Sequence, residues 1–493
     1  MTTWTEPVRR ARPFSQLELA TVSAIIVGGA ALRIFRLTFQ SLWFDELFSV
    51  VFSRSGLSVS AIVEKYAGDV HSIGYPLALH LWLRLFGDND LAARSLSAVW
   101  GVLGIAALWL AARRLGGPRL GIVAALLLSV NAYHIAYSQE ARSYALVFVF
   151  AVFSYLALLV FVDAPGWRRA AVFGATVAVA FHIHYYALVM FFGQIVAATV
   201  VLVLTKNGWR DLRYLVVAGA VVVLGMLPWI GPFLRVAGFD RYWPAVPEPW
   251  FAVDYFHTYF GENLFLSLSF GGLLLALPFL LRPGQNKAED GEERPLRMTA
   301  TVLALSVVAS LAAAYGRSVL AVPMLIPRFT FVLLPAVILL IAVALSRIRP
   351  PLARTAVVVA VVAVSLTNLA LGDYYTRPRK EQWREATVRV LEDPRFQPGA
   401  DAILAMYAPG FQYYADQYAP GLVVEEATVE ALEVVVGGDR PETVVWLLTA
   451  RGSSPPEAFM DLLRARFERT DSVGFIATRV ERWAPGPGAA ATE

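Results

Sequence analysis

The chain has 493 residues, of which 57% are hydrophobic and 16% are charged, with no cysteine and a formal net charge of +4. Soluble domains contain about 45–50% apolar and about 25% charged residues, so this composition excludes an ordinary soluble protein. The missing cysteines exclude disulfides and thiolate metal sites. The positive charge does not indicate nucleic-acid binding, because the basic residues lie at the ends of apolar runs, where they orient membrane proteins.

Apolar runs recur along the chain as far as residue 371. A run of roughly 17–25 residues can cross a hydrocarbon core about 30 Å thick. The first run is too long for a signal peptide and lacks a clear cleavage site, so we interpret it as a retained span. We predict a polytopic α-helical membrane protein with about eleven transmembrane helices, at residues 17–37, 92–113, 118–133, 143–162, 168–183, 186–205, 213–233, 264–282, 297–316, 328–346 and 354–371.

Lysine and arginine residues are unevenly shared between the joints that connect these spans. If the N-terminus is cytoplasmic, every joint assigned to the cytoplasm is rich in basic residues, as the positive-inside rule requires. An odd number of spans then places the C-terminus outside. The sequence thus predicts a multi-pass protein of the plasma membrane, with residues 1–372 as its transmembrane domain.

The expected outer loop at residues 38–91 contains a second apolar stretch, HSIGYPLALHLWLRLFG at 71–87. This stretch is short and interrupted, which favours a helix that lies in the membrane interface. The alternative is a twelfth span, which would invert every later joint and spoil the distribution of basic residues.

The composition becomes mixed after residue 372, which predicts an extracytoplasmic α/β domain at 373–484 and a disordered tail at 485–493. About 120 residues are enough to bury a small core. Amphipathic patterns predict helices at 380–393 and 456–469, and alternating apolar patterns predict strands at 401–408, 443–450 and 472–483.

Two adjacent carboxylates, Asp45 and Glu46, follow the first span and lie between Trp43, Phe44 and Phe48. Adjacent residues on a helix point about 100° apart, so both cannot face one substrate. One of them could reach into a cavity while the other makes a structural bond. Apolar surroundings raise the tendency of a carboxylate to take a proton, as a general base requires. The alternative is an ordinary pair of interfacial acids.

Other ionisable residues lie at the same expected face. Glu140 and Arg142 lie where an outer loop meets a span, and a mutual salt bridge is the plain reading of that pair. His182 and His184 are two residues apart, and His71 is isolated; hydrogen bonding in an aqueous cavity suits them better than metal ligation. A carboxylate with one of these histidines could hold a divalent ion, but no metal-binding spacing requires a cofactor.

Arg328 lies between Pro327 and Phe329, at the outer start of a long apolar span. Proline is well tolerated in the first turn of a helix, so the guanidinium can emerge near the free N–H groups of the helix terminus. This combination favours a phosphate ligand. The alternative is an interface anchor that extends to the lipid headgroups.

Seven short segments carry a resemblance to a known family. They occur in family order and cover nearly the whole chain: LWFDE (42–46), HSIGYPLALHLWLRLFG (71–87), AARSLSAVWGVL (92–103), YSQEARSYAL (137–146), HIHYYAL (182–188), PRFTFVLLP (327–335) and RKEQWREATVRVL (379–391). The chain resembles the GT-C superfamily of membrane glycosyltransferases, and within it the bacterial family 39-like members related to protein O-mannosyltransferases and aminoarabinose transferases. It departs from relatives that have His-Pro-Pro-Leu-Tyr where this chain has HSIGY.

The resemblance implies transfer of a sugar from a polyprenyl-phosphate donor to an acceptor at the outer face of the membrane. It implies that Asp45 is the catalytic base with Glu46 as its neighbour, and that Arg328 grips the donor phosphate. Residues expected to line the cavity or bind substrate are His71, Tyr75, Glu140, Arg142, Tyr144, His182, His184 and Tyr185.

The expected partners are the lipid-linked donor, a glycan, lipid or protein acceptor, and membrane lipids, without nucleic acid. Two other classes remain: a transporter or flippase of lipid-linked sugars, and a non-catalytic lipid-binding protein. The ionisable residues cluster at one face rather than in the middle of spans, which argues against transport.

Overall fold

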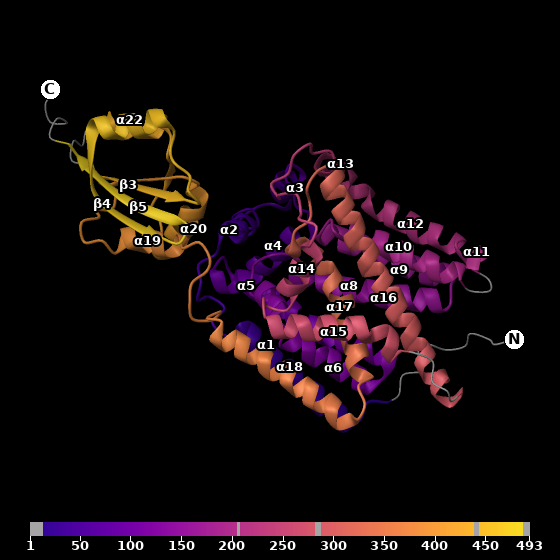
Figure 1. The fold of residues 1–493 in the computed structure, drawn as a ribbon. Helices are drawn as coiled ribbons and strands as arrows, with labels where there is room; N and C mark the ends of the chain where they lie inside the picture. The colour runs from indigo at the N-terminus through magenta and orange to yellow at the C-terminus, as the bar shows by residue number, and fades with distance from the viewer. Residues whose placement is uncertain (1–12, 205–207, 282–286, 438–442, 487–493) are drawn as a thin grey trace. The chain divides into compact units, whose positions relative to one another are not determined.

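The computed structural model describes residues 13–204, 208–281, 287–437 and 443–486, and these form two compact units (Figure 1). The helical unit comprises the chain up to residue 35, residues 58–79 and residues 94–372. The sheet unit comprises residues 36–57, 80–93 and 373 onward. Residues 36–57 and 80–93, which the sequence grouped with the membrane spans, therefore pack with the C-terminal segment.

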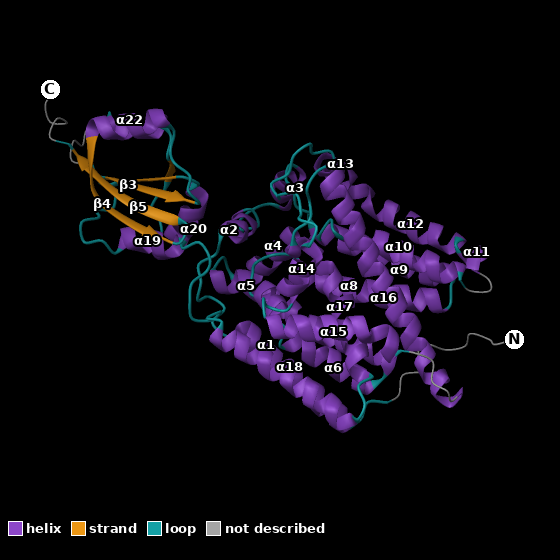
Figure 2. Ribbon diagram, viewed as in Figure 1, coloured by secondary structure: helices purple, strands orange, loops and turns teal. Residues whose placement is uncertain are grey.

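The helical unit is built from helices joined by turns and loops, the longest of which lies between Ala237 and Phe251 among the described residues (Figure 2). Its helices are α1 Gln16–Ile34, α3 Val59–Ala67, α6 Pro118–Ser129, α7 Ala132–Ser138, α8 Tyr144–Asp163, α9 Trp167–Ile183, α10 Ala187–Val203, α11 Gly208–Asp211, α12 Arg213–Met226, η1 Leu227–Trp229, α13 Ile230–Ala237, α14 Phe251–Tyr259, α15 Leu264–Leu280, α16 Lys287–Leu320, η2 Pro327–Leu333, α17 Leu334–Ser346 and α18 Pro351–Leu371. Helices α4 Gly74–Phe86 and α5 Asp90–Gly116 contribute residues to both units, and α2 Phe44–Val51 belongs to the sheet unit.

Helix α17 forms the centre of the helical unit, because every residue from 334 to 345 is buried. It packs against α6, α8, α15 and α16. Helix α18 is also apolar enough to span a membrane but is mostly exposed, with side chains such as Leu352 and Val359 on its surface. Exposed apolar side chains along a helix of this length are what a hydrocarbon environment requires.

Within the described residues, seven helices are long and apolar enough to cross a membrane, and up to nine if each bent pair counts as one span. The bent pairs are α6 with α7, at 65°, and α14 with α15, at 112°. Each of the eleven predicted spans overlaps a helix. The predicted number is higher because α9 and α10 have only 17 residues each, or about 26 Å at 1.5 Å per residue.

Helix α4 occupies the stretch for which a twelfth span was the alternative. It has 13 residues, which correspond to about 20 Å along a helix axis. A hydrocarbon core of about 30 Å exceeds that length, so α4 is too short to cross as a twelfth span.

The sheet unit contains a five-stranded mixed sheet in its described part, in the order β2-β1-β3-β5-β4. Strands β1, β2 and β3 pair in parallel, and β5 pairs antiparallel with both β3 and β4. Helices cover both faces of the sheet, with α22 on one face and α19 on the other (Figure 1). The elements are β1 Ala402–Ala405, β2 Glu425–Glu426, β3 Val445–Ala450, β4 Phe467–Phe475, β5 Thr478–Pro485, α19 Trp383–Leu391, α20 Ala408–Tyr418, α21 Val429–Val436 and α22 Glu457–Arg466.

The strand predicted at 472–483 is extended as expected but is divided between two strands, because the chain there makes a hairpin of β4 and β5. The alternation of Val473, Phe475 and Ala477 ends at the turn, where Ala477 has a left-handed φ of 56°, and apolar residues resume out of phase at Val480. Elements α20, α21 and β2 were not predicted. The predicted tail begins inside β5, which ends at Pro485, and its residues 487–493 lie outside the described residues.

Candidate active site

The two adjacent acids of α2 have different surroundings. Glu46 is fully buried (0% exposed), and its Oε2 accepts from Lys380 Nζ at 3.1 Å and from the backbone N–H of Trp43 at 3.3 Å. Asp45 is half-buried, and its carbonyl oxygen accepts from the hydroxyl of Ser49 at 3.0 Å. Glu46 therefore makes the structural bond of the pair, and Asp45 is the more exposed of the two acids.

Tyr407 is a neighbour of Asp45 that the sequence did not indicate. Burial, followed by the charges of Glu426 and Asp45, raises the pKa of Tyr407 to about 12, so the phenol keeps its proton at neutral pH. Its ring centroid lies 4.8 Å from that of Phe44. Its φ of 66° is left-handed, which is uncommon for a bulky residue, and Glu426 accepts from its N–H at 2.8 Å. The structure places a protonated phenol near the candidate base.

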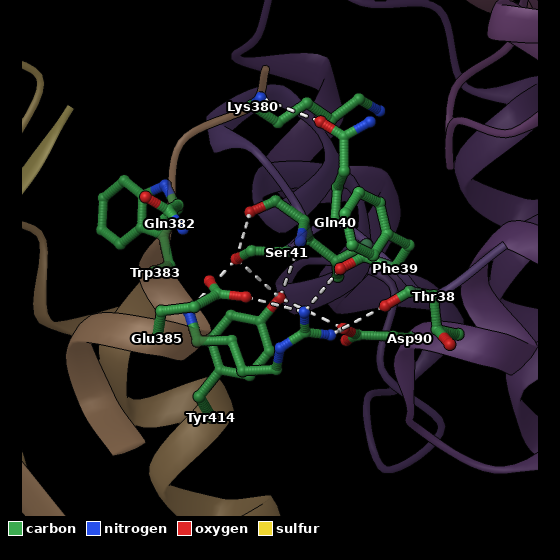
Figure 3. A network of polar contacts seen from close by, with 12 residues as sticks. Thr38, Phe39, Gln40, Ser41, Asp90, Lys380, Gln382, Trp383, Glu385 and Tyr414 are labelled. Carbon is green, nitrogen blue, oxygen red and sulfur yellow. Dashed lines mark hydrogen bonds and ion pairs between the residues drawn. The ribbon is translucent and has the colours of Figure 1, made fainter. Parts of the chain in front are cut away.

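The segment before Asp45 is held by the start of the C-terminal segment, as Figure 3 shows for residues 38–41. Arg384 donates from Nη1 to the carbonyl of Thr38 and from Nη2 to that of Phe39, both at 2.9 Å. Its guanidinium also lies 3.6 Å from Asp90 Oδ2. One arginine thus joins three parts of the sheet unit that are distant in the sequence.

The same C-terminal motif contacts α2 directly. Glu381 Oε2 accepts from the N–H of Phe44 at 2.8 Å, and the side chain of Gln40 accepts from the N–H groups of Arg379 and Lys380 at 2.7 and 3.0 Å (Figure 3). The motif RKEQWRE at 379–385 therefore holds the segment that carries Asp45 in place through hydrogen bonds.

In the helical unit, His71 bridges an acid and a base. Its Nδ1 lies 2.5 Å from Asp69 Oδ1, and its Nε2 lies 2.7 Å from Arg142 Nη2. An arginine can only donate, so His71 Nε2 accepts and Nδ1 carries the proton that is donated to Asp69. Burial opposes ionisation of Asp69, but the hydrogen bonds that it accepts from His71 outweigh burial and lower the pKa of Asp69. The chain Asp69–His71–Arg142 thus fixes the direction of a buried guanidinium.

His184 lies where this chain meets the start of η2. Burial, followed by the nearby His71, Arg142 and Arg328, lowers the pKa of His184 to about 3, so its ring is neutral at physiological pH. Its ring centroid is 5.7 Å from that of Tyr144 and 5.8 Å from that of Phe329. Two arginines therefore approach one neutral imidazole, and the local charge is positive.

Arg328 leads η2, as the sequence predicted for the start of a late span. Its guanidinium carbon lies 5.1 Å from the ring centroid of Trp243 and 6.0 Å from that of Phe329. Burial raises the pKa of Tyr242, and Arg328 is among the charges that oppose this rise. The residues 242–243 belong to a long loop whose aromatic side chains the sequence did not assign to the site.

The remaining expected residues support the surrounding backbone. Tyr185 donates to the carbonyl of His71 at 3.3 Å and accepts from the indole N–H of Trp229 at 2.8 Å. His182 Nε2 lies 2.8 Å from the carbonyl oxygen of Gly225. Tyr75 is buried, with its hydroxyl 3.2 Å from the hydroxyl of Ser97. These contacts make His182, Tyr185 and Tyr75 structural neighbours of the cluster.

Glu140 and Arg142 are joined through the backbone, where the N–H of Arg142 donates to the carbonyl of Glu140 at 2.7 Å. The guanidinium of Arg142 reaches His71. Space is tight at Gly74 of the HSIGY motif, where a Cβ would lie 2.5 Å from the carbonyl oxygen of His182. The start of α4 therefore approaches the end of α9 more closely than another residue at position 74 would allow.

No group of three or more His, Asp or Glu side chains that could hold a metal ion occurs in the described ranges. The functional neighbours that sequence reasoning missed are Asp69, Trp243, Lys380 and Tyr407. Asp69 had a local signal, since it lies two residues before His71. The other three lie near candidate residues of their own unit, Trp243 by Arg328 in the helical unit, and Lys380 by Glu46 and Tyr407 by Asp45 in the sheet unit. No spacing in the sequence indicates these tertiary neighbours.

Comparison with known proteins gives the molecule a context. Residues 70–231 match the family model described as dolichyl-phosphate-mannose-protein mannosyltransferase, and no curated protein sequence matches significantly. ArnT from Cupriavidus metallidurans in the apo state is 14% identical and has a TM-score of 0.60, covering 96% of this chain and 99% of its own. ArnT bound to undecaprenyl phosphate is 15% identical, with a TM-score of 0.56 over 97% of this chain and 99% of its own. The chain has the GT-C fold of ArnT, and its resemblance to the GT-C membrane glycosyltransferases is confirmed.

Proposed function

We propose that this protein is a membrane glycosyltransferase that moves a sugar from a polyprenyl-phosphate donor to an acceptor at the extracytoplasmic face. In this proposal Asp45 is the general base and Arg328 binds the donor phosphate. The N-terminus is cytoplasmic, residues 1–372 carry the membrane spans, and residues 373–484 form an extracytoplasmic domain. The acceptor is a glycan, a lipid or a protein.

The observation that carries this proposal is the likeness to ArnT along almost the whole chain, including ArnT bound to undecaprenyl phosphate. The match of residues 70–231 to a family described by a lipid-phosphate sugar donor points to the same substrate class. That matched range contains His71, Arg142 and His184, the residues that meet around the positive cluster.

The chemistry of the cluster suits a lipid-phosphate leaving group. Arg142 is buried and oriented by His71, and Arg328 is half-buried beside Trp243. Guanidinium groups bind phosphate through paired, charge-assisted hydrogen bonds, and cations placed where negative charge develops stabilise the transition state. A second cation, Arg142, is thus a candidate for the same phosphate.

The chemistry of Asp45 suits the acceptor. The attacking hydroxyl must lose its proton as the glycosidic bond forms, and a carboxylate within hydrogen-bond reach can take it. Tyr407, whose phenol is protonated at neutral pH, lies close enough to Asp45 to feel its charge. A direct displacement at the anomeric carbon predicts a product with inverted configuration; a product with retained configuration would contradict the single-step route.

Reconstituted protein should be assayed with a radiolabelled polyprenyl-phosphate sugar and a mixture of cell-envelope acceptors. Formation of a new glycosidic bond that is lost in Asp45→Asn, with donor binding retained, supports the proposal. The exposed Asp416, which pairs with Arg54 in the same unit, provides the matched control as Asp416→Asn. Movement of the donor across vesicles without a new bond would identify a transporter instead, and donor binding without either event would identify a lipid-binding protein.

A further inference from the structure

The sheet unit contains an open cleft of about 710 Å³ between α22 and one face of the sheet. Pockets that hold small ligands have volumes of about 300–1,000 Å³. The side chains that give this cleft its chemistry are Thr449, Arg464, Arg469, Arg479, Glu481 and Trp483. None of them belongs to the candidate active site described above.

The cleft exists because one face of the sheet is apolar in one part and charged in another. Residues paired across antiparallel strands share a face, so Val445 lies beside Trp483, Leu447 beside Glu481, and Thr449 beside Arg479. Val445, Leu447 and Trp483 pack under α21 and α22 in the core of the unit. Charged side chains do not fill the space under a helix as apolar ones do, because they keep contact with water. The charged part of this face therefore stays open.

A buried carboxylate lies in the floor of the cleft. Glu481 is 7% exposed, and it accepts from Arg469 Nη1 at 3.0 Å and from the indole N–H of Trp483 at 3.2 Å. Arg479 Nη1 is 4.0 Å from the same carboxylate. A carboxylate has about four acceptor positions, so Glu481 keeps capacity to accept from the hydroxyl groups of a ligand.

The rim of the cleft is positively charged. Its described lining holds three arginines and one glutamate. The side chains of Arg464, Arg469 and Arg479 are 62%, 52% and 60% exposed, so their guanidinium groups are accessible. An arginine rim around one acceptor carboxylate matches a ligand that carries both an anionic group and hydroxyl donors.

We propose that this cleft binds an anionic saccharide, with its carboxylate or phosphate on Arg464 and Arg479 and a sugar hydroxyl on Glu481. A polyphosphate without hydroxyl groups fits less well, because Glu481 would repel it. This inference rests on the proposed function in one respect: the saccharide is assigned as the acceptor, or part of the acceptor, of the transfer reaction.

The proposal can be tested by measuring the binding of trigalacturonate to the full-length protein in detergent. The methyl ester of the same trisaccharide serves as a neutral sugar, and pyrophosphate serves as an anion without sugar. We expect trigalacturonate to bind, and Arg479→Gln and Arg464→Gln each to weaken it about fivefold to tenfold, as loss of a partly exposed charged hydrogen bond should. Arg377→Gln is the matched control, because Arg377 is 78% exposed and pairs with Asp373 away from the cleft. Both cleft arginines are exposed, so their loss should leave the thermal midpoint unchanged.

Equal binding of trigalacturonate to the wild type and both cleft variants overturns the proposal. Pyrophosphate binding as tightly as trigalacturonate, with no gain from the sugar, also overturns it, since the site would then be a general anion site. The Asp45→Asn variant should bind trigalacturonate normally, so the binding measurement tests the cleft independently of turnover. A wild-type protein that binds trigalacturonate but transfers no sugar would contradict the proposed function alone, and a normal KM for anionic acceptors in Arg479→Gln would contradict the assignment of the saccharide as acceptor.

Discussion

Two clusters of ionisable residues, one in each unit of the molecule, are built differently. In the sheet unit, Glu46 and Arg384 are bonded to Lys380, Asp90 and backbone groups of distant segments, so their charges hold the chain together. In the helical unit, Asp69, His71 and Arg142 form a short chain at the ends of helices, beside the neutral ring of His184. The first arrangement joins segments that are distant in the sequence, whereas the second fixes the direction of a single buried guanidinium, that of Arg142.

The largest effects are expected from substitution of the adjacent acids Asp45 and Glu46, whose side chains have different surroundings. Asp45→Asn should lower kcat by about 10² to 10⁴, the range for loss of a general base, with the thermal midpoint within 2 °C or so of the wild type because the side chain is half-buried. Radiolabel transfer and differential scanning fluorimetry measure the two effects. An active Asp45→Asn protein would assign the base to another residue.

Glu46→Gln should act on stability instead. Removing one member of a buried pair leaves the other charge uncompensated and costs about 3–5 kcal/mol, and Glu46 is fully buried against Lys380. The free energy of unfolding, measured by chemical denaturation, should fall accordingly. The double variant Glu46→Gln with Lys380→Met should recover part of the loss, because no buried charge then remains unpaired. If the losses of unfolding free energy in the two single variants simply add in the double variant, the two side chains are not coupled.

Arg328→Gln should weaken donor binding about 10- to 100-fold, since a charge-assisted contact to phosphate is worth about 1.5–3 kcal/mol. Binding of a fluorescent polyprenyl phosphate to detergent-solubilised protein measures this. Arg241→Gln is the matched control, because Arg241 is exposed on the loop that carries Trp243. An equal loss in both variants would point to general electrostatic attraction rather than a phosphate site.

Asp69→Asn should have the smallest effect, a loss of about 1 kcal/mol in stability and about a threefold loss of donor affinity, because it only orients His71 and through it Arg142. The folded pKa of Asp69 lies below its ordinary value. The stabilisation that ionised Asp69 gives to the folded state is therefore present at pH values above its unfolded pKa of about 3.9, and it is lost as the pH falls through its lower folded pKa. Thermal midpoints measured from pH 7 to pH 3 should fall more steeply in the wild type than in Asp69→Asn, and parallel curves would contradict the role of this carboxylate.

Part of the site could be predicted because its signals are local. Arg328 was expected at the start of a late apolar segment, and the structure has it leading η2. The different roles of Asp45 and Glu46 could be expected from helix geometry, which separates adjacent side chains by about 100°. Which of the two is buried depends on Lys380, 334 residues further along the chain, and no periodicity conveys a contact over that distance.

The membrane class of this protein could be inferred from composition alone: apolar runs require a bilayer, and the change of composition after residue 372 requires a second folded region. Three features emerge only in the folded chain: residues 36–57 and 80–93 pack with that second region, Glu46 pairs with Lys380, and a charged cleft lies beside α22. The reason is physical. Hydrophobic patterning acts over a few turns of chain, whereas ion pairs and clefts arise between segments that come together only when the chain has folded.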